Sequence, residues 1–301
     1  MTLSSSDEKR RKGVIAMKSH SAFAVSLFSV AMGAFCFSGN TWASCGLEYC
    51  RASNNNVAEP IALKMPVSTR IAAFEFDAGS GNYLQTNLAA QYTITSNVHL
   101  MAQMGWVYLD VDGQSAVGFS NPIASLEYDF FTNENTTFFL GSQFEFPLGN
   151  SSNGIAASHF EALPYVRSAW NFAPITMDAR LGVRFSMSSG DHRHHGETEQ
   201  SDSHAHEETS FNFVSPHRDQ ELLYRLMVGK PVFNHRLQAQ LFVDGQTVLE
   251  DPDIGKTFVN TGLCSKWNAH RNVIVTANAE FPITSNRRFS WRYSLEAIVQ
   301  L

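Results

Sequence analysis

Apolar and polar residues alternate with a period of two along most of this chain, and that period predicts β-strands. In residues 174–188, one register is entirely apolar and the other carries every charge of the segment. The same separation recurs in residues 158–172 and in residues 288–301. The pattern therefore predicts an all-β chain whose strands have one apolar face and one charged face.

Many of these segments are longer than the strands of soluble β-sandwiches, which average about five or six residues. Long strands with bulky apolar residues on one face and charges on the other suit lipid outside and a polar lumen inside. Aromatic residues near the strand ends would form girdles at the membrane interfaces; they are Tyr92, Trp106, Tyr108, Trp170, Trp267 and Trp291. We therefore expect a closed antiparallel transmembrane β-barrel.

The alternating segments number about twelve, and an even number closes a barrel with both chain ends on one side. They are 70–77, 82–94, 97–110, 118–131, 135–147, 158–172, 174–188, 218–231, 233–247, 254–268, 270–283 and 288–301. Short and long connections then alternate along the chain. Because outer-membrane barrels have short periplasmic turns and longer external loops, we expect 147–157 and 189–218 to lie outside.

The N-terminal region has the order of a secretory signal peptide. A basic residue, Lys18, precedes the apolar run 22–37, and small residues follow it up to Ala43. The run is shorter than the roughly 20 residues of a spanning helix, which disfavours a retained anchor. We expect residues 1–43 to be removed, with Met17 as an alternative start, and the outer membrane of a Gram-negative bacterium as the destination.

Removal of residues 1–43 changes the charge of the chain. Lys and Arg fall from 22 to 17 because five lie in this segment, and Asp and Glu fall from 28 to 26. The mature chain then carries 17 − 26 = −9 formal charges. This negative charge argues against nucleic acid as a partner.

Residues 44–68 would form a periplasmic segment that precedes a barrel of residues 69–301. The segment holds Cys45 and Cys50, which are close enough in sequence for a disulfide in an oxidising compartment. A metal-binding pair is the alternative. Cys264 falls in the inward register of its strand, where a small filler is expected.

Two short segments resemble sequences of an outer-membrane barrel family of transporters, the family labelled as a phenol-degradation MetA pathway. They are residues 45–50 (CGLEYC) and residues 144–149 (FEFPLG) at the end of a strand. The family often has Pro-Thr-Gly at the second place, where this chain has Pro147, Leu148 and Gly149. The resemblance implies a barrel that passes small solutes.

The predicted external loop 189–218 is rich in histidine and in carboxylates. Imidazole is a good ligand for zinc, copper and nickel, and His-x-His places two ring nitrogens within reach of one ion. The candidate metal ligands are His192, His194, His195, His204 and His206. A solvated polar loop with incidental metal affinity is the alternative, because a loop must lose entropy before it coordinates an ion.

Charged residues in the inward registers are the second candidate site. They include Glu161, Arg167, Asp178, Arg180, Arg184, Arg292 and Glu296. Since 158–172 and 174–188 are neighbours, we expect their opposite charges to pair across the two strands. Such charges either select solutes at a constriction or neutralise one another and fill the barrel.

These observations predict a channel for small solutes, with divalent cations among the candidates. The first alternative is a non-conducting structural or adhesive surface barrel. A second alternative, an outer-membrane hydrolase, is disfavoured because Ser152-Asn153-Gly154 has the features of a turn. We therefore expect no enzymatic activity and no required cofactor. Lipids are the expected surroundings of the barrel, and a homo-oligomer is compatible with its aromatic exterior.

Overall fold

The computed structural model describes residues 63–76, 79–187, 219–232 and 236–301. All of them belong to one compact unit. Among these residues, regular structure consists of β-strands and one short 3-10 helix, η3 (Ser151–Asn153). In this part of the chain, no helix is both long and apolar enough to cross a membrane.

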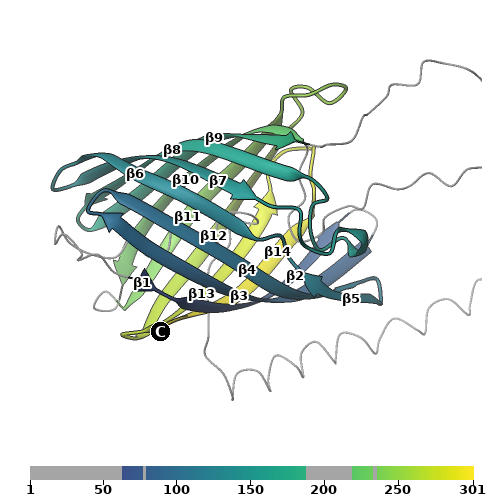
Figure 1. Cartoon of the computed structure of the whole chain (residues 1–301), viewed down its shortest axis with the longest axis horizontal. Helices are drawn as coiled ribbons and strands as arrows, with labels where there is room; N and C mark the ends of the chain where they lie inside the picture. Colours follow the sequence, from purple (N-terminus) through teal and green to yellow (C-terminus); the bar gives the residue numbers. More distant parts are fainter. Residues whose placement is uncertain (1–62, 77–78, 188–218, 233–235) are drawn as a thin grey trace, which may run out of the picture. The chain divides into compact units, whose positions relative to one another are not determined.

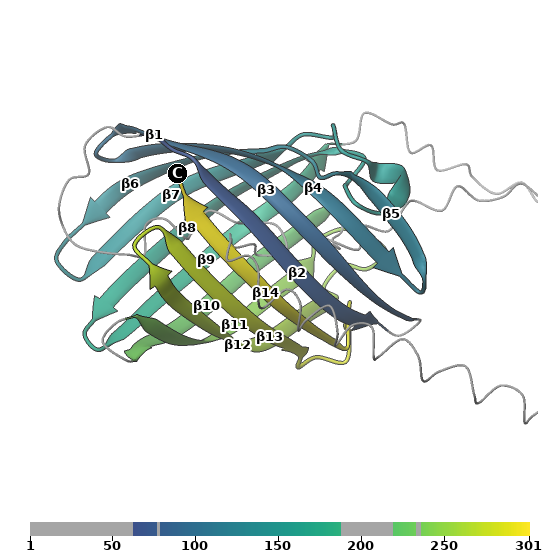
Figure 2. The same ribbon diagram turned by 90° about the horizontal axis from the view of Figure 1, so that it is seen from below.

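Twelve of the described strands form a closed antiparallel ring (Figures 1 and 2). The ring contains β2 (Pro66–Phe76), β3 (Gly79–Thr95), β4 (Val98–Val111), β6 (Ile123–Thr132), β7 (Thr136–Glu145), β8 (Phe160–Phe172), β9 (Ile175–Met187), β10 (Gln220–Val232), β11 (Leu237–Val248), β12 (Thr257–His270), β13 (Val273–Pro282) and β14 (Trp291–Gln300). Pairing of β14 with β2 closes the ring. The structure thereby confirms the predicted twelve-stranded barrel.

Two further strands lie at the margins of the ring. β1 (Leu63–Lys64) pairs with β3, and β5 (Gln114–Phe119) pairs with β4. β4 thus pairs first with β5 and then with β6, so the predicted strand 118–131 is divided at residues 120–122. The ring also begins at Pro66, within the segment 44–68 that was predicted to precede the barrel.

The two ends of the barrel differ in their connections, and the longest described connections all lie at one end, as the sequence predicted. One end of the barrel, here called the short-turn end, has connections at 96–97, 133–135, 173–174 and 271–272. The opposite end, here called the long-loop end, has the connections 146–159, 249–256 and 283–290. At this end, the turn from β4 to β5 has positive φ angles at Asp112 (50°) and Gly113 (81°), which suits a two-residue hairpin.

The outer face of the barrel is apolar. On β9, Arg180 and Arg184 are buried, whereas Leu181 and Phe185 between and beside them are exposed. Because the wall is one sheet thick, the buried register faces the inside and the exposed register faces the surroundings. An apolar exterior on a ring with no unpaired edge meets both requirements for residence in a bilayer.

The inner face is apolar where β2, β3 and β4 approach the long-loop end. Buried residues form an apolar inner cluster there, consisting of Ala72, Phe74, Tyr83, Val107, Leu109 and Ile155. Ile155 belongs to the connection 146–159, within the segment 147–157 that was predicted to lie outside. Its exposed fraction is 1%. Residues 154–157 of this connection are buried and pack toward the inner wall, whereas residues 146–148 are exposed.

Candidate functional site: the charged lumen

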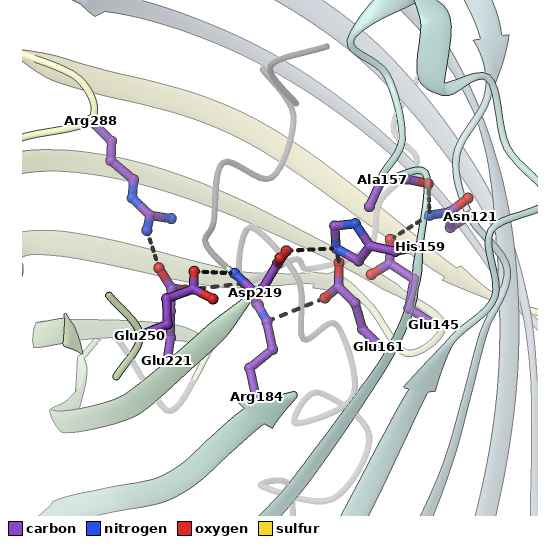
Figure 3. A network of polar contacts seen from close by, with 10 residues as sticks. All are labelled: Asn121, Glu145, Ala157, His159, Glu161, Arg184, Asp219, Glu221, Glu250 and Arg288. Carbon is purple, nitrogen blue, oxygen red and sulfur yellow. Dashed lines mark hydrogen bonds and ion pairs between the residues drawn. The ribbon is translucent and has the colours of Figure 1, made fainter. Parts of the chain in front are cut away.

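A group of residues at the long-loop end of the lumen forms a network of ion pairs and hydrogen bonds (Figure 3). We call this group the mouth network; it comprises Asn121, Glu145, Ala157, His159, Glu161, Arg184, Asp219, Glu221, Glu250 and Arg288. Glu221 on β10 is fully buried and pairs with two guanidinium groups. Arg184 Nη1 lies 3.4 Å from Glu221 Oε2, and Arg288 Nη2 pairs with Glu221 Oε1.

The network continues from β9 to β8 and the residue before β10. Arg184 Nε lies 3.3 Å from Glu161 Oε2. His159 Nε2 lies 3.3 Å from the other oxygen of Glu161 and 3.8 Å from Asp219 Oδ1. The backbone N–H of Asp219 donates to Glu250 Oε1 at 3.0 Å. Through these contacts the network joins three neighbouring strands to the connections before β8, β10 and β12.

Asn121 holds the connection 146–159 in place. Its Nδ2 donates to Glu145 Oε1 at 2.9 Å and to the carbonyl oxygen of Ala157 at 2.8 Å. Its Oδ1 accepts a hydrogen bond of 2.9 Å from the backbone N–H of Gly149. Asn121 lies at the break between β5 and β6, so this irregular position provides the side chain that fixes the inward loop.

His159 is the titratable imidazole of the mouth network. The hydrogen bond with Glu161 raises the pKa of His159 above its ordinary value, and partial burial opposes that effect. The carboxylates of Glu161, Asp219 and Glu145 raise the pKa further through their charge. The surroundings therefore favour the protonated imidazole.

A second cluster lies closer to the middle of the barrel wall. Arg167 on β8 pairs with Asp178 Oδ2 at 2.9 Å and with Glu127 Oε1 at 3.5 Å. Tyr165 O–H donates to the same oxygen of Glu127 at 3.2 Å. The Arg180 guanidinium carbon lies 3.6 Å from the centre of the Tyr165 ring, a cation–π contact. These contacts hold charged and aromatic side chains together on the inner surface.

Ion pairs also line the strands that close the ring. Arg70 on β2 pairs with Glu296 on β14 at 3.3 Å, and both side chains are buried. Arg292 pairs with Glu280 on β13 at 2.6 Å. Charged pairs therefore occur on both sides of the lumen.

The seven charged residues predicted for the lumen all take part in these contacts. Arg167 and Asp178 pair across β8 and β9, as the neighbouring registers predicted. Glu161 pairs with Arg184 instead of Arg167 or Arg180. The prediction did not include Glu127, Glu221 and Arg288. Glu221 and Glu127 lie in ordinary alternating strands, whereas Arg288 lies in a connection where period two gives no signal.

Several predicted features lie outside the described residues. These are the signal peptide 1–43, the Cys45–Cys50 pair and the five loop histidines, His192, His194, His195, His204 and His206. Within the described ranges, no group of three or more His, Cys, Asp or Glu is arranged to hold a metal ion. Cys264 is buried on β12, which agrees with its predicted inward place.

Comparison with known proteins supports the fold. No protein-family model matches the chain. No curated protein sequence matches it either. The crystal structure of an outer membrane channel from Pseudomonas putida F1 has a TM-score of 0.59 and 10% sequence identity, and the match covers 85% of this chain and 100% of that one. The likeness is one of fold.

Two porins give lower scores. The KdgM porin has a TM-score of 0.48 at 10% identity, covering 78% of this chain and 99% of that one. The NanC porin has a TM-score of 0.47 at 10% identity, covering 79% of this chain and 100% of that one.

Proposed function

We propose that this protein is a channel for small solutes in the outer membrane of a Gram-negative bacterium. The observation that carries the proposal is the opposition of faces in the closed ring, with exposed apolar residues outside and buried charge networks inside. Buried ion pairs contribute little net stability, so stability alone does not account for the buried Glu221 with its two arginines. The fold likeness to the Pseudomonas putida channel is consistent with this function.

The mouth network suits a constriction that solutes pass. Its charged groups come from β7, β8, β9 and β10 and from four connections at the long-loop end, so a solute entering there would meet them (Figure 3). Rings of carboxylates and guanidinium groups are the usual means by which protein pores choose among small polar solutes. Passage through such a constriction requires no bond to be broken and no cofactor.

Divalent cations are one candidate class of solute. The histidines at 192, 194, 195, 204 and 206 would collect zinc, copper or nickel ahead of the mouth, where neutral imidazoles can ligate them. Because ligation needs neutral histidine with an ordinary pKa of about 6.5, we expect metal capture to weaken below about pH 6.

A non-conducting barrel is the second candidate, and the apolar inner cluster favours it. Ile155 and its neighbours fill part of the inner space with packed side chains. If packing of this kind continued across the lumen, the barrel would have a structural or adhesive role.

Single-channel recording in planar bilayers separates the two candidates. The protein purified from membranes should give steady conductance steps, and zinc added on the side of the long loops should change them. A variant with the five histidines replaced by glutamine should conduct equally and lose the zinc response. Silent bilayers, despite verified insertion, would contradict the channel and leave the structural barrel. Conductance with an unchanged zinc response in the variant would contradict metal capture.

A further inference from the structure

Carboxylates outnumber guanidinium groups in the mouth network. Five carboxylates (Glu145, Glu161, Asp219, Glu221 and Glu250) stand against two arginines (Arg184 and Arg288), which gives 2 − 5 = −3 formal charges when His159 is neutral. Protonation of His159 changes the sum to −2. Because imidazole is the side chain whose ordinary titration falls between pH 5 and 8, this histidine links the charge of the mouth to pH.

His159 lies next to two carboxylates of the mouth network. It is the last residue of the connection 146–159 and immediately precedes β8. Its Nε2 faces Glu161 on β8 at 3.3 Å and Asp219 before β10 at 3.8 Å. Glu145, at the end of β7, also acts on the imidazole through its charge.

Arg184, the neighbouring arginine, cannot provide a charge that changes with pH. Arg184 on β9 is the cation facing this site, and its Nε is directed to the other oxygen of Glu161, Oε2. Arg184 also pairs with Glu221 through Nη1. Since the guanidinium group remains charged throughout the physiological range, its share of the mouth charge is constant. His159 therefore provides the part of the mouth charge that changes with pH.

We propose that His159 is the residue that sets the cation preference of this channel according to pH. The protonated imidazole engages Glu161 and Asp219 and lowers the negative charge that a permeating cation meets. When the imidazole is neutral, it no longer balances the charge of these carboxylates. Asp219, whose side chain is 44% exposed, can then attract cations that pass through the mouth. The inference rests on the proposed channel function and identifies a residue that tunes its selectivity.

The raised pKa of His159 is consistent with this role. The hydrogen bond with Glu161 and the charge of Asp219 shift the pKa of His159 upward from the ordinary histidine value. An ordinary rise of external pH would then increase the preference for cations.

Reversal potentials test the proposal. The wild-type protein in a planar bilayer under a potassium chloride gradient should show a potassium-to-chloride permeability ratio that rises about twofold between pH 5 and 9. The H159Q variant, which stays neutral, should have the high ratio at every pH. As a matched control, H270Q alters an exposed histidine at the short-turn end and should retain the wild-type pH dependence.

The results separate this proposal from the channel itself. A conducting H159Q protein with the wild-type pH dependence would overturn the role of His159, as would a wild-type ratio that does not change with pH. A wild-type protein that never conducts would overturn the channel function and this inference with it. Should H159Q fail to insert, D219N provides the second test, because it leaves the imidazole intact and should reduce the change in ratio.

Discussion

Two regions of the same inner surface differ in how they fill the long-loop end of the barrel. The apolar inner cluster on β2, β3 and β4 packs Phe74, Val107 and Ile155 together. The mouth network on β8, β9 and β10 consists of ion pairs centred on Glu161 and Glu221. The comparison indicates that alternation fixes which side chains face inward, while the chemistry of the lumen differs from wall to wall.

One loop contributes to both regions. The connection 146–159 places Ile155 in the apolar inner cluster and His159 in the mouth network. Asn121 holds the same loop through the carbonyl of Ala157, which lies between these two residues. Anchoring by apolar packing on one side therefore fixes the position of the titratable group on the other.

Removal of the central carboxylate should have the largest effect. In E221Q, Arg184 and Arg288 lose a fully buried anionic partner, so we expect a loss of about 3–5 kcal/mol in the free energy of unfolding. Denaturant titration of the protein in detergent micelles measures this loss. E134Q, in an exposed turn, is the control and should leave stability unchanged. Equal stability of E221Q and the wild type would show that the network contributes nothing to folding.

Truncation in the apolar region should have a somewhat smaller effect. I155A removes most of a side chain that is 1% exposed, and we expect destabilisation of about 2–4 kcal/mol. Because the loop loses its anchor, we also expect a larger single-channel conductance. L148A, in the same loop but 76% exposed, should change neither quantity. An I155A variant with wild-type conductance would mean that the loop does not narrow the lumen.

The cluster at the middle of the wall tests whether polar regions are packed as closely as apolar ones. A Cβ at Gly141 would lie 2.3 Å from a ring carbon of Tyr165, so G141A should destabilise the barrel by about 1–3 kcal/mol. The same substitution in a Y165A background should have little effect, because the obstructing ring is absent. Independent, additive effects in this double-mutant cycle would contradict direct crowding.

The smallest expected effect is the contribution of His159 to stability as pH changes. A raised pKa in the folded state means that the folded protein binds the proton more tightly than the unfolded chain. The resulting stabilisation is complete below the unfolded pKa of about 6.5 and is lost as pH rises through the folded pKa. Unfolding midpoints of wild type and H159Q should therefore diverge at low pH and converge at high pH. Divergence in the opposite direction would exclude the assigned contacts.

The sequence predicted the inner face well where charges mark it. On β9 every charge lies in one register, so the inward positions of Asp178, Arg180 and Arg184 could be read directly from period two. On β4 both faces are apolar near the long-loop end, with Val107 inward and Trp106 outward. Alternation of polarity could not distinguish these faces, and the apolar inner cluster was therefore not predicted.

Contacts between the connections and distant strands could not be predicted from the sequence either. Ile155 lies in a segment rich in Asn, Ser and Gly, a composition that favours a solvated turn. Its burial depends on the inner wall formed by distant strands. Arg288 and Glu221 are 67 positions apart and do not lie on neighbouring strands, so no register relates them. Pairs on adjacent strands, such as Arg167 with Asp178, were predictable because hairpin neighbours are known once the strands are known.

Closure of the ring has a consequence for how the barrel folds. Most neighbouring strands are consecutive in sequence, and the hairpins that they form can assemble locally and rapidly. The seam between β2 and β14 is different, because its Arg70–Glu296 ion pair joins residues 226 positions apart. Formation of this seam is the single step of high contact order, and we expect it to limit the folding rate. It also means that a circularly permuted chain, cut in an exposed connection and rejoined across the seam, could build the same barrel from local hairpins in a different order.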